Sequence, residues 1–334
     1  MIYRLKKIWN PGIFQGFNRK DHYFEGWYYK MVAPGGKHVL AVIPGMARNE
    51  KSGDSHSFVQ VLNGTTGGVQ YHRYPADAFS ASKTEHDIRV GASRFRPGKI
   101  ELDIDDKEGS LKGSLTFGAL APWPVTFFRP GYMGWYAFVP FMECYHGVLS
   151  FDHAVTGSIS LGKTEMDFTG GRGYMEKDWG VSFPRSWVWM QSNNFDKPGV
   201  SFVMSIATIP WMKNYFTGFG GAFWDNGDFY PFTTWNGSKV KNLQIGKEQA
   251  SFSVVHKKYM VKVTAQGKDT GELLSPVFGE MAGKVLESMK ATITVQMFKK
   301  EGKTFREIFS GAGSSGGLEV MGDPEQLQNG LSGG

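Results

Sequence analysis

Apolar and polar residues alternate along much of the chain, with the period of two expected of strands that bury one face. Ile100, Leu102 and Ile104 are separated by acidic residues, and the same alternation recurs at 111–117, 259–263 and 293–297. Turn signals such as Asn63-Gly64 and Asn236-Gly237 lie between these stretches. Only 279–290 has a helix-like spacing. The pattern therefore predicts an all-β protein.

The two halves of the chain share an order of features that indicates an internal repeat. A tryptophan-tyrosine run at 27–30 is followed by a Pro-Gly loop and by a strand that ends at Pro44. The run at 187–191, a second Pro-Gly loop and a strand ending at Pro210 repeat this order. We expect two related β-domains, at 1–170 and 171–325, followed by a flexible tail at 326–334.

Composition narrows the classes of function. The 334 residues are 41% hydrophobic and 15% aromatic, enough for two cores, and the net charge of +6 is too small and too spread out to indicate nucleic-acid binding. A single cysteine, Cys144, excludes an internal disulfide framework. The sequence contains no stretch of 18 apolar residues and no signal peptide, so a cytoplasmic location is expected.

Two glycine-rich motifs match nucleotide-binding patterns without the necessary context. The segment 157–164 fits the phosphate-loop pattern, but its alternation predicts a strand and a hairpin turn at Gly162-Lys163-Thr164. The segment 311–316 fits the dinucleotide fingerprint, yet no helix follows it, and we interpret it as a flexible loop. The eight histidines show no paired metal spacing. No cofactor and no metal are therefore expected, and Cys144 beside His146 is interpreted as a buried thiol on the same strand face.

Carboxylates set among tryptophan and tyrosine form the pattern with the strongest chemical content. They lie in the runs 23–30 and 173–191, which contain Glu25, Glu176 and Asp178. Burial among aromatic rings raises the pKa of a carboxyl group and makes it a usable acid, and the rings stabilise a cation. The alternative is structural: Glu25, Lys177 and Arg185 would then form an ionic plug at the end of a β-barrel.

These runs resemble the tocopherol cyclase family, and the order of matching motifs is kept from residue 11 to residue 322. The matching motifs are Phe24-Glu25-Gly26-Trp27-Tyr28, Gly134-Trp135, Phe138-Val139-Pro140-Phe141, Glu176-Lys177-Asp178-Trp179-Gly180, the run 183–193, Trp235-Asn236-Gly237 and the segment 311–322. The resemblance implies two tandem lipocalin-like antiparallel β-barrels. It also implies a cofactor-free enzyme that protonates the tail alkene of a prenylated hydroquinone and closes a chromanol ring. The wider group includes carotenoid hydratases, and the short N-terminus, which lacks a plastid-type leader, is typical of a bacterial member.

The chemistry that the resemblance implies needs an acid, aromatic walls and polar groups for the phenol. We expect Glu176 to be the acid, ahead of Asp178 and then Glu25. The predicted walls are Trp27, Trp179, Trp187 and Trp189, and the predicted phenol contacts are Tyr28, Gln191 and Asn193.

Two other functions fit the same residues. A non-catalytic lipocalin-like carrier of an isoprenoid would need the apolar cavity but no acid, and a sugar-binding β-domain would need the aromatic rings exposed along a groove. The expected partner is a hydrophobic small molecule. The segment 2–9 mixes apolar residues with Arg4, Lys6 and Lys7, which predicts either a peripheral membrane contact or a packed terminus.

Overall fold

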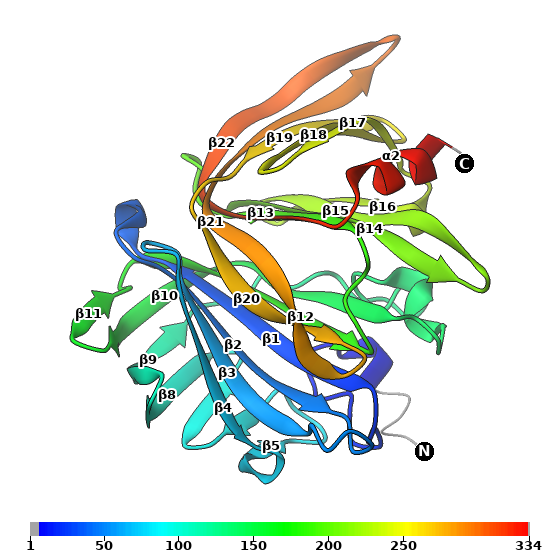
Figure 1. The fold of residues 1–334 in the computed structure, drawn as a ribbon. Helices are drawn as coiled ribbons and strands as arrows, with labels where there is room; N and C mark the ends of the chain where they lie inside the picture. The colour runs from blue at the N-terminus through cyan, green and yellow to red at the C-terminus, as the bar shows by residue number, and fades with distance from the viewer. Residues whose placement is uncertain (1–6, 333–334) are drawn as a thin grey trace. The chain divides into compact units, whose positions relative to one another are not determined.

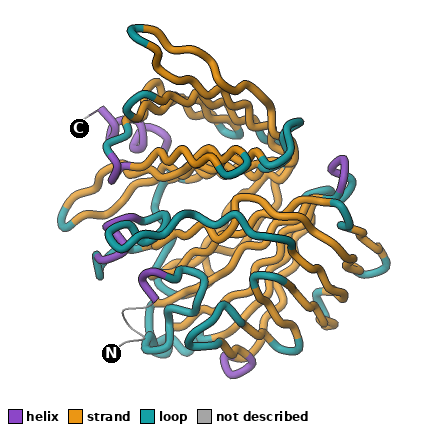
Figure 2. The backbone as a smooth tube through the Cα atoms, turned by 180° about the vertical axis from the view of Figure 1, so that it is seen from behind, coloured by secondary structure: helices purple, strands orange, loops and turns teal. Residues whose placement is uncertain are grey.

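The computed structural model describes residues 7–332. Strands make up most of the chain, and the few helices are short (Figure 2). The chain divides into two compact units, unit 1 with Met1–Phe183 and Glu272–Lys284, and unit 2 with Pro184–Gly271 and Val285–Gly334. The predicted all-β class with two large antiparallel sheets in tandem is confirmed. In the described residues, 7–332, no helix is both long enough and apolar enough to cross a membrane.

Unit 1 is built on a 12-stranded antiparallel sheet with the path β4-β3-β2-β1-β12-β10-β9-β8-β7-β6-β5, and β11 pairs with β10 (Figure 1). Its strands are β1 (Tyr23–Val32), β2 (Val39–Arg48), β3 (His56–Asn63), β4 (Gly68–Pro75), β5 (Phe79–Ala81), β6 (Ile88–Val90), β7 (Ser93–Arg96), β8 (Lys99–Asp106), β9 (Gly109–Phe117), β10 (Cys144–Leu161), β11 (Thr164–Asp167) and β12 (Gly171–Gly180). Its 3-10 helices are η1 (Lys7–Trp9), η2 (Pro34–Gly36), η3 (Ala76–Ala78) and η4 (Gly134–Phe138).

Unit 2 contains most of a 10-stranded sheet with the path β16-β15-β14-β13-β22-β21-β19-β18-β17, and β20 pairs with β21. The strands of this sheet are β13 (Trp187–Ser192), β14 (Val200–Trp211), β15 (Asn214–Asp225), β16 (Asp228–Thr233), β17 (Lys239–Gly246), β18 (Gln249–His256), β19 (Tyr259–Gln266), β20 (Thr270–Val277), β21 (Glu280–Glu301) and β22 (Thr304–Met321). Most of β20 and the start of β21 fall in unit 1. The 3-10 helix η5 (Thr234–Asn236) and the helix α2 (Pro324–Ser332) complete unit 2.

Residues 272–284 form most of β20 and the start of β21, and they belong to unit 1, whereas the residues before and after them belong to unit 2. The Gln60 side chain of β3 accepts from Leu274 N at 2.7 Å and donates to Leu274 O at 3.2 Å. The Asn49 amide donates to Glu280 at 2.7 Å. Unit 1 is therefore completed by a segment that lies about 90 residues beyond its main part.

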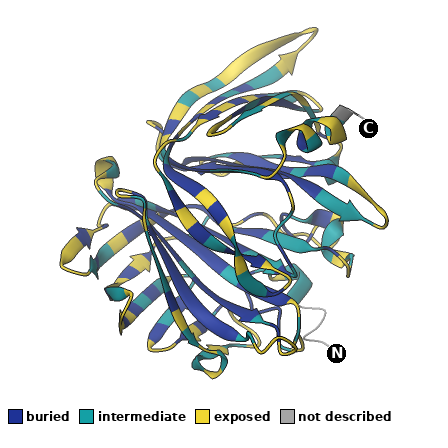
Figure 3. Ribbon diagram, in the orientation of Figure 1, coloured by how far each residue is buried: buried dark blue, intermediate teal, exposed yellow. Residues whose placement is uncertain are grey.

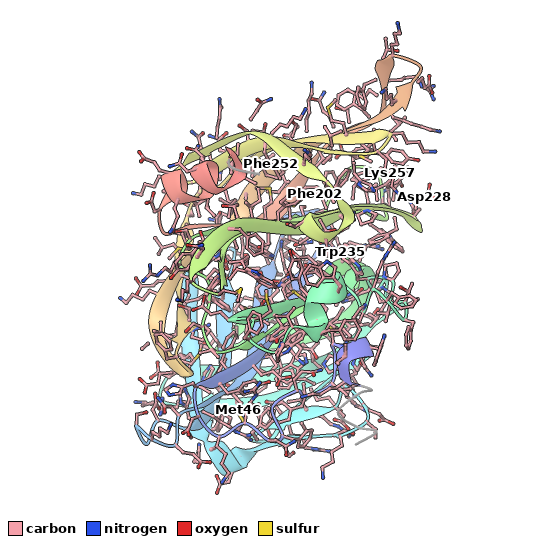
Figure 4. The ribbon with its side chains drawn as sticks, turned by 90° about the vertical axis from the view of Figure 1, so that its right-hand side faces the viewer. Met46, Phe202, Asp228, Trp235, Phe252 and Lys257 are labelled. Carbon is pink, nitrogen blue, oxygen red and sulfur yellow. The ribbon has the colours of Figure 1, made fainter. Side chains whose placement is uncertain are left out.

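Each unit has its own apolar core, and the apolar residues of the alternating stretches contribute to it. Ile100, Leu102 and Ile104 of β8 all point into the first core and are buried. The central strands of both sheets are largely buried, whereas the outer hairpins are exposed (Figure 3). Figure 4 marks Met46, a member of the first core, and Phe202 with Phe252, members of the second.

Four local expectations differ from the structure, and one holds. Residues 171–183 lie in unit 1, because β12 pairs with β1 and β10. The expected tail at 326–334 begins within helix α2. The segment 279–290, with its helix-like spacing, lies mostly in β21, and the glycines at 311–316 lie inside β22 rather than in a loop. The hairpin turn at Gly162-Lys163 between β10 and β11 is confirmed.

Candidate active site

Strand β12 places its two expected acids, Glu176 and Asp178, on the same face. Successive side chains of a strand point to opposite sides. Met175 and Trp179 pack on the first core, so Lys177, which lies between them, points to the same side. Glu176 and Asp178 point to the other side. The two expected acids of β12 are therefore separated from the core.

Glu25 lies on the core side, fully enclosed. Its carboxylate forms an ion pair with Lys177, and both side chains have 0% exposure. The Gln15 backbone N–H donates to both carboxylate oxygens at 2.9 Å, and the Tyr23 hydroxyl donates to Oε2 at 2.5 Å. With its acceptor sites occupied by these donors, Glu25 has the arrangement of the ionic-plug alternative.

Lys177 completes this plug. Its ammonium donates to the carbonyl oxygens of Pro11 at 2.8 Å and Ile13 at 2.6 Å. It lies 4.7 Å from the ring centroids of both Trp27 and Trp179, in cation–π geometry. Burial lowers the pKa of Lys177 to about 8, although the negative charge of Glu25 acts to raise it. Trp27 and Trp179 thus enclose an ammonium group of the protein itself. Arg185, the third expected plug residue, lies instead in unit 2, over the ring of Tyr215.

The opposite face of β12 carries a hydrogen-bonded cluster of Tyr174, Glu176, Asp178 and His146, called here the His146 cluster. Strand β10 pairs with β12 so that His146 faces Asp178. His146 Nδ1 lies 2.8 Å from Asp178 Oδ1, and His146 Nε2 lies 3.4 Å from Glu176 Oε2. The Tyr174 hydroxyl donates to Glu176 Oε2 at 2.5 Å. The imidazole is therefore hydrogen-bonded to Asp178, whereas its Nε2 is near Glu176 in an ion pair without forming a hydrogen bond.

The charges of this cluster favour the protonated imidazole. Burial by itself disfavours the imidazolium, but the charges of Asp178 and Glu176 and the hydrogen bond to Asp178 outweigh it and raise the pKa of His146 to about 9. The ring of Tyr132 lies edge-on, 4.4 Å from the imidazole. Burial, followed by the charge of Glu176, raises the pKa of Tyr174 well above its ordinary value. At neutral pH the cluster therefore favours an imidazolium that donates to Asp178 and has the Glu176 carboxylate near its other nitrogen.

The same three side chains have the spacing of a metal site. The ligating atoms of His146, Glu176 and Asp178 all lie within 4.8 Å of one another, and among residues 7–332 they are the only such group. A metal needs a neutral imidazole as its ligand, whereas these carboxylates favour the imidazolium, so protonation competes with metal binding. Protonation of His146 and metal binding by these three side chains therefore exclude each other. The spacing of histidines in the sequence gave no sign of this cluster.

Tyr28 is the expected substrate contact that lies next to the His146 cluster. It faces Glu176 directly in the register of β1 with β12. Direct partners in an antiparallel pair share a face, with Cβ atoms about 5 Å apart. Tyr28 is buried, and it alternates with Trp27, which points into the core. The structure thus brings together Tyr28, Glu176 and Asp178, and it places Glu25, Trp27 and Trp179 on the other side of the sheet.

The remaining expected contacts lie in unit 2. Trp187, Trp189 and Gln191 share one face of β13, because the residues between them, Val188 and Met190, point into the second core. All three are buried. They form a face of tryptophan and amide groups on the side of the sheet away from the second core.

Two glutamates that the sequence analysis did not single out border this face. Trp187 Nε1 donates to Glu319 Oε2 at 2.6 Å. Glu319 faces Trp189 on one side and Glu287 on the other in the strand register. Gln191 donates to Asn193 Oδ1 at 3.3 Å. Glu287 and Glu319 were missed because they lie in β21 and β22, far along the chain from the tryptophans.

His146 and Tyr174 were also missed as functional residues. The period of two places Tyr174, Glu176 and Asp178 on one face, and this signal was available in the sequence. The position of His146, 32 residues before Asp178, depends on the register of β10 with β12. Cys144 shares the His146 face, and its Sγ lies 4.0 Å from Asp178 Oδ1. Burial raises the pKa of this thiol well above its ordinary value, so it is a weak nucleophile.

Comparison with known proteins finds sequences and structures similar to this chain. The profile of the "Tocopherol cyclase-like" family matches residues 114–322. A probable chloroplastic tocopherol cyclase of Oryza sativa subsp. japonica and the chloroplastic tocopherol cyclase of Zea mays are each 26% identical over 204 residues, which are 57% of this chain and 42% of each relative. The chain thus matches less than half the length of these relatives.

Solved structures show the same fold. A structure of CghA with Sch210972 has a TM-score of 0.55 at 11% identity, covering 90% of this chain and 89% of that one. Kievitone hydratase from Nectria haematococca has a TM-score of 0.53 at 11% identity, covering 94% of each chain. At these identities the likeness concerns the fold.

Proposed function

The chain belongs to the tocopherol cyclase-like family, and from that premise we propose that it is a cofactor-free enzyme that cyclises a prenylated hydroquinone. The proposal rests on the His146 cluster, in which one imidazole is hydrogen-bonded to Asp178 and lies 3.4 Å from Glu176. Protonation of an alkene requires a buried acid with a source of protons behind it. A carrier needs no such relay, and for this reason the cluster favours the enzyme over the carrier.

Glu176 is the proposed acid. In its protonated form the carboxyl group gives its proton to the tail alkene, whose double bond opens to a tertiary cation. The phenol oxygen then attacks this cation, a C–O bond forms, and the phenol proton returns to the cluster. One proton is added and one is released, so the reaction is an isomerisation that consumes no co-reactant.

His146 is proposed to recharge Glu176, with Asp178 as its positioning residue. The imidazolium, which the two carboxylates favour, is the nearby proton source, and its Nε2 lies 3.4 Å from Glu176 Oε2. Asp178 holds the Nδ1 side of the ring and leaves Nε2 facing Glu176.

The substrate class follows from the family, and its details stay predictions. Tyr28 beside Glu176 is the proposed contact for the phenol end, because its hydroxyl offers both a donor and an acceptor. Trp187, Trp189, Gln191 and Asn193 stay predicted substrate contacts of unit 2. We expect a hydrophobic small molecule with a prenyl tail. The cytoplasmic location with membrane contact likewise stays a prediction.

The test is a turnover assay on a phytylated dimethylhydroquinone with four proteins: wild type, Glu176→Gln, Asp178→Asn and Glu165→Gln. Glu165 is an exposed carboxylate on β11 and serves as the matched control. We expect chromanol from wild type and from the control, a loss of at least 100-fold with Glu176→Gln, and a smaller loss with Asp178→Asn.

Each other outcome of this assay points to a different conclusion. Full activity of Glu176→Gln would refute its role as the acid. If folded wild type gives no product, a panel of other prenylated phenols is assayed next. Tight binding of such ligands without conversion would favour the carrier.

A further inference from the structure

Exposed large apolar side chains are concentrated in one short segment of the described chain. Of the 13 exposed large hydrophobic residues among residues 7–332, six fall within the 17 residues 125–141. These six are Val125, Phe127, Phe128, Trp135, Phe138 and Phe141. Exposed apolar patches of this kind mark interaction surfaces. Four of the six are phenylalanine and one is tryptophan, whose aromatic rings are suited to an interface between water and lipid.

The most exposed pair lies at the tip of a closed turn. Thr126 N donates to Arg129 O at 3.0 Å, and Arg129 N donates to Thr126 O at 3.1 Å. These bonds leave Phe127 and Phe128 at the tip, 70% and 78% exposed. The turn therefore presents two adjacent aromatic rings to the surroundings, with a cationic side chain directly after them.

The N-terminal 3-10 helix η1 packs against this turn. The indole of Trp9 stacks on Phe127 at 5.6 Å between ring centroids and meets Phe138 at 5.7 Å. Trp9 Nε1 donates to Phe127 O at 2.9 Å. We call Trp9, Phe127, Phe128 and Phe138 the aromatic surface. It joins the two segments, and residues 1–6, which include most of the expected membrane-contacting run, lie outside the described residues.

The charge of both segments has one sign. The sequence contains no Asp or Glu between residues 1 and 20 or between residues 109 and 142. The same stretches carry Arg129, directly after the exposed phenylalanines, and Lys7, whose ammonium donates to Gln15 O at 2.9 Å. Aromatic residues next to cations, without carboxylates on their own segments, complement the negatively charged face of a lipid bilayer.

We propose that the aromatic surface docks this protein on membranes that contain anionic lipid, with Phe127 and Phe128 inserted among the headgroups. The proposal rests on exposure, turn geometry and charge, and it stands whether or not the protein is a cyclase. A second copy of the chain that docked through the same segments would bring no negative charge to this surface, because these segments contain no Asp or Glu.

Co-sedimentation with vesicles tests the proposal on the full chain. The vesicles are pure phosphatidylcholine or a mixture with about one-third phosphatidylglycerol. Wild type should bind the anionic vesicles. The double variant Phe127→Ser/Phe128→Ser should bind them at least 10-fold more weakly, because two exposed rings no longer enter the interface. Arg129→Gln should weaken binding to the anionic vesicles and leave any binding to neutral vesicles unchanged.

The matched control is the double variant Met212→Ser/Phe305→Ser, which removes exposed apolar side chains from other hairpins. It should bind like wild type. The proposal is overturned if wild type stays in the supernatant with anionic vesicles, or if both double variants bind as tightly as wild type. Light scattering gives a further check: a dimer that the Phe127→Ser/Phe128→Ser variant abolishes would assign the surface to self-association and overturn membrane docking.

Discussion

Replacing Glu25 with glutamine should destabilise unit 1 by about 3–5 kcal/mol, because it leaves the ammonium of Lys177 buried without its counter-charge. Both side chains are fully buried, so no water can substitute for the lost carboxylate. The loss of stability cannot exceed the free energy of deprotonating Lys177, because a neutral amine needs no counter-charge. For an ordinary lysine at pH 7 this deprotonation costs about 5 kcal/mol. The carbonyl oxygens of Pro11 and Ile13 still accept from Lys177, which places the expected loss toward the lower end.

Urea unfolding measures this loss. Trp27 and Trp179 flank the ammonium and report on unit 1 by fluorescence, while far-ultraviolet circular dichroism follows both units. The double variant Glu25→Gln/Lys177→Met removes both charges and should recover most of the stability, within about 2 kcal/mol of wild type. An unfolding midpoint of Glu25→Gln equal to that of wild type would refute the reasoning. So would a double variant no more stable than the single one, because uncompensated charge would then not be the cause.

The remaining two predictions concern the His146 cluster and the tryptophan face of unit 2. The pKa of His146 is about 9 in the folded protein and about 6.5 in the unfolded chain, so its stabilising contribution is complete below pH 6.5 and is lost as the pH rises through 9. Urea unfolding should show a loss of about 3 kcal/mol over this range that His146→Asn abolishes, and an equal slope in the variant would contradict this assignment. Gly317→Ala should lower stability by about 1–3 kcal/mol, because its Cβ would lie 2.4 Å from the ring of Trp189. Thermal unfolding and near-ultraviolet circular dichroism check this against Gly98→Ala, where nothing lies within 4 Å, and two indistinguishable variants would argue against the steric contact.

The alternation of apolar and polar residues predicted the strands that bury one face against a core. It predicted 293–297 of β21 but failed at 279–290, in the first part of β21, and at the glycines 311–316 of β22. Gly313 and Gly316 suggested a loop, yet a Cβ on Gly313 would lie 2.6 Å from Ser192 Oγ, and one on Gly316 would lie 2.8 Å from Ala291 O. The glycines are there because neighbouring atoms approach closely. Such an approach depends on pairing partners distant in the chain, and a single sequence does not reveal it.

The sequence by itself determined that this is an all-β protein, that carboxylates lie among aromatic residues, and that the chain resembles the tocopherol cyclase family. The tertiary structure alone decided which of these carboxylates is locked in an ion pair and which is joined to an imidazole. Glu25 and Glu176 have similar aromatic neighbours in the sequence, but Glu25 meets Lys177 inside the core, whereas Glu176 meets His146 on the opposite face. The physical reason is that a strand's period of two fixes which side chains share a face, while the register of strands far apart in the chain fixes what each of them meets.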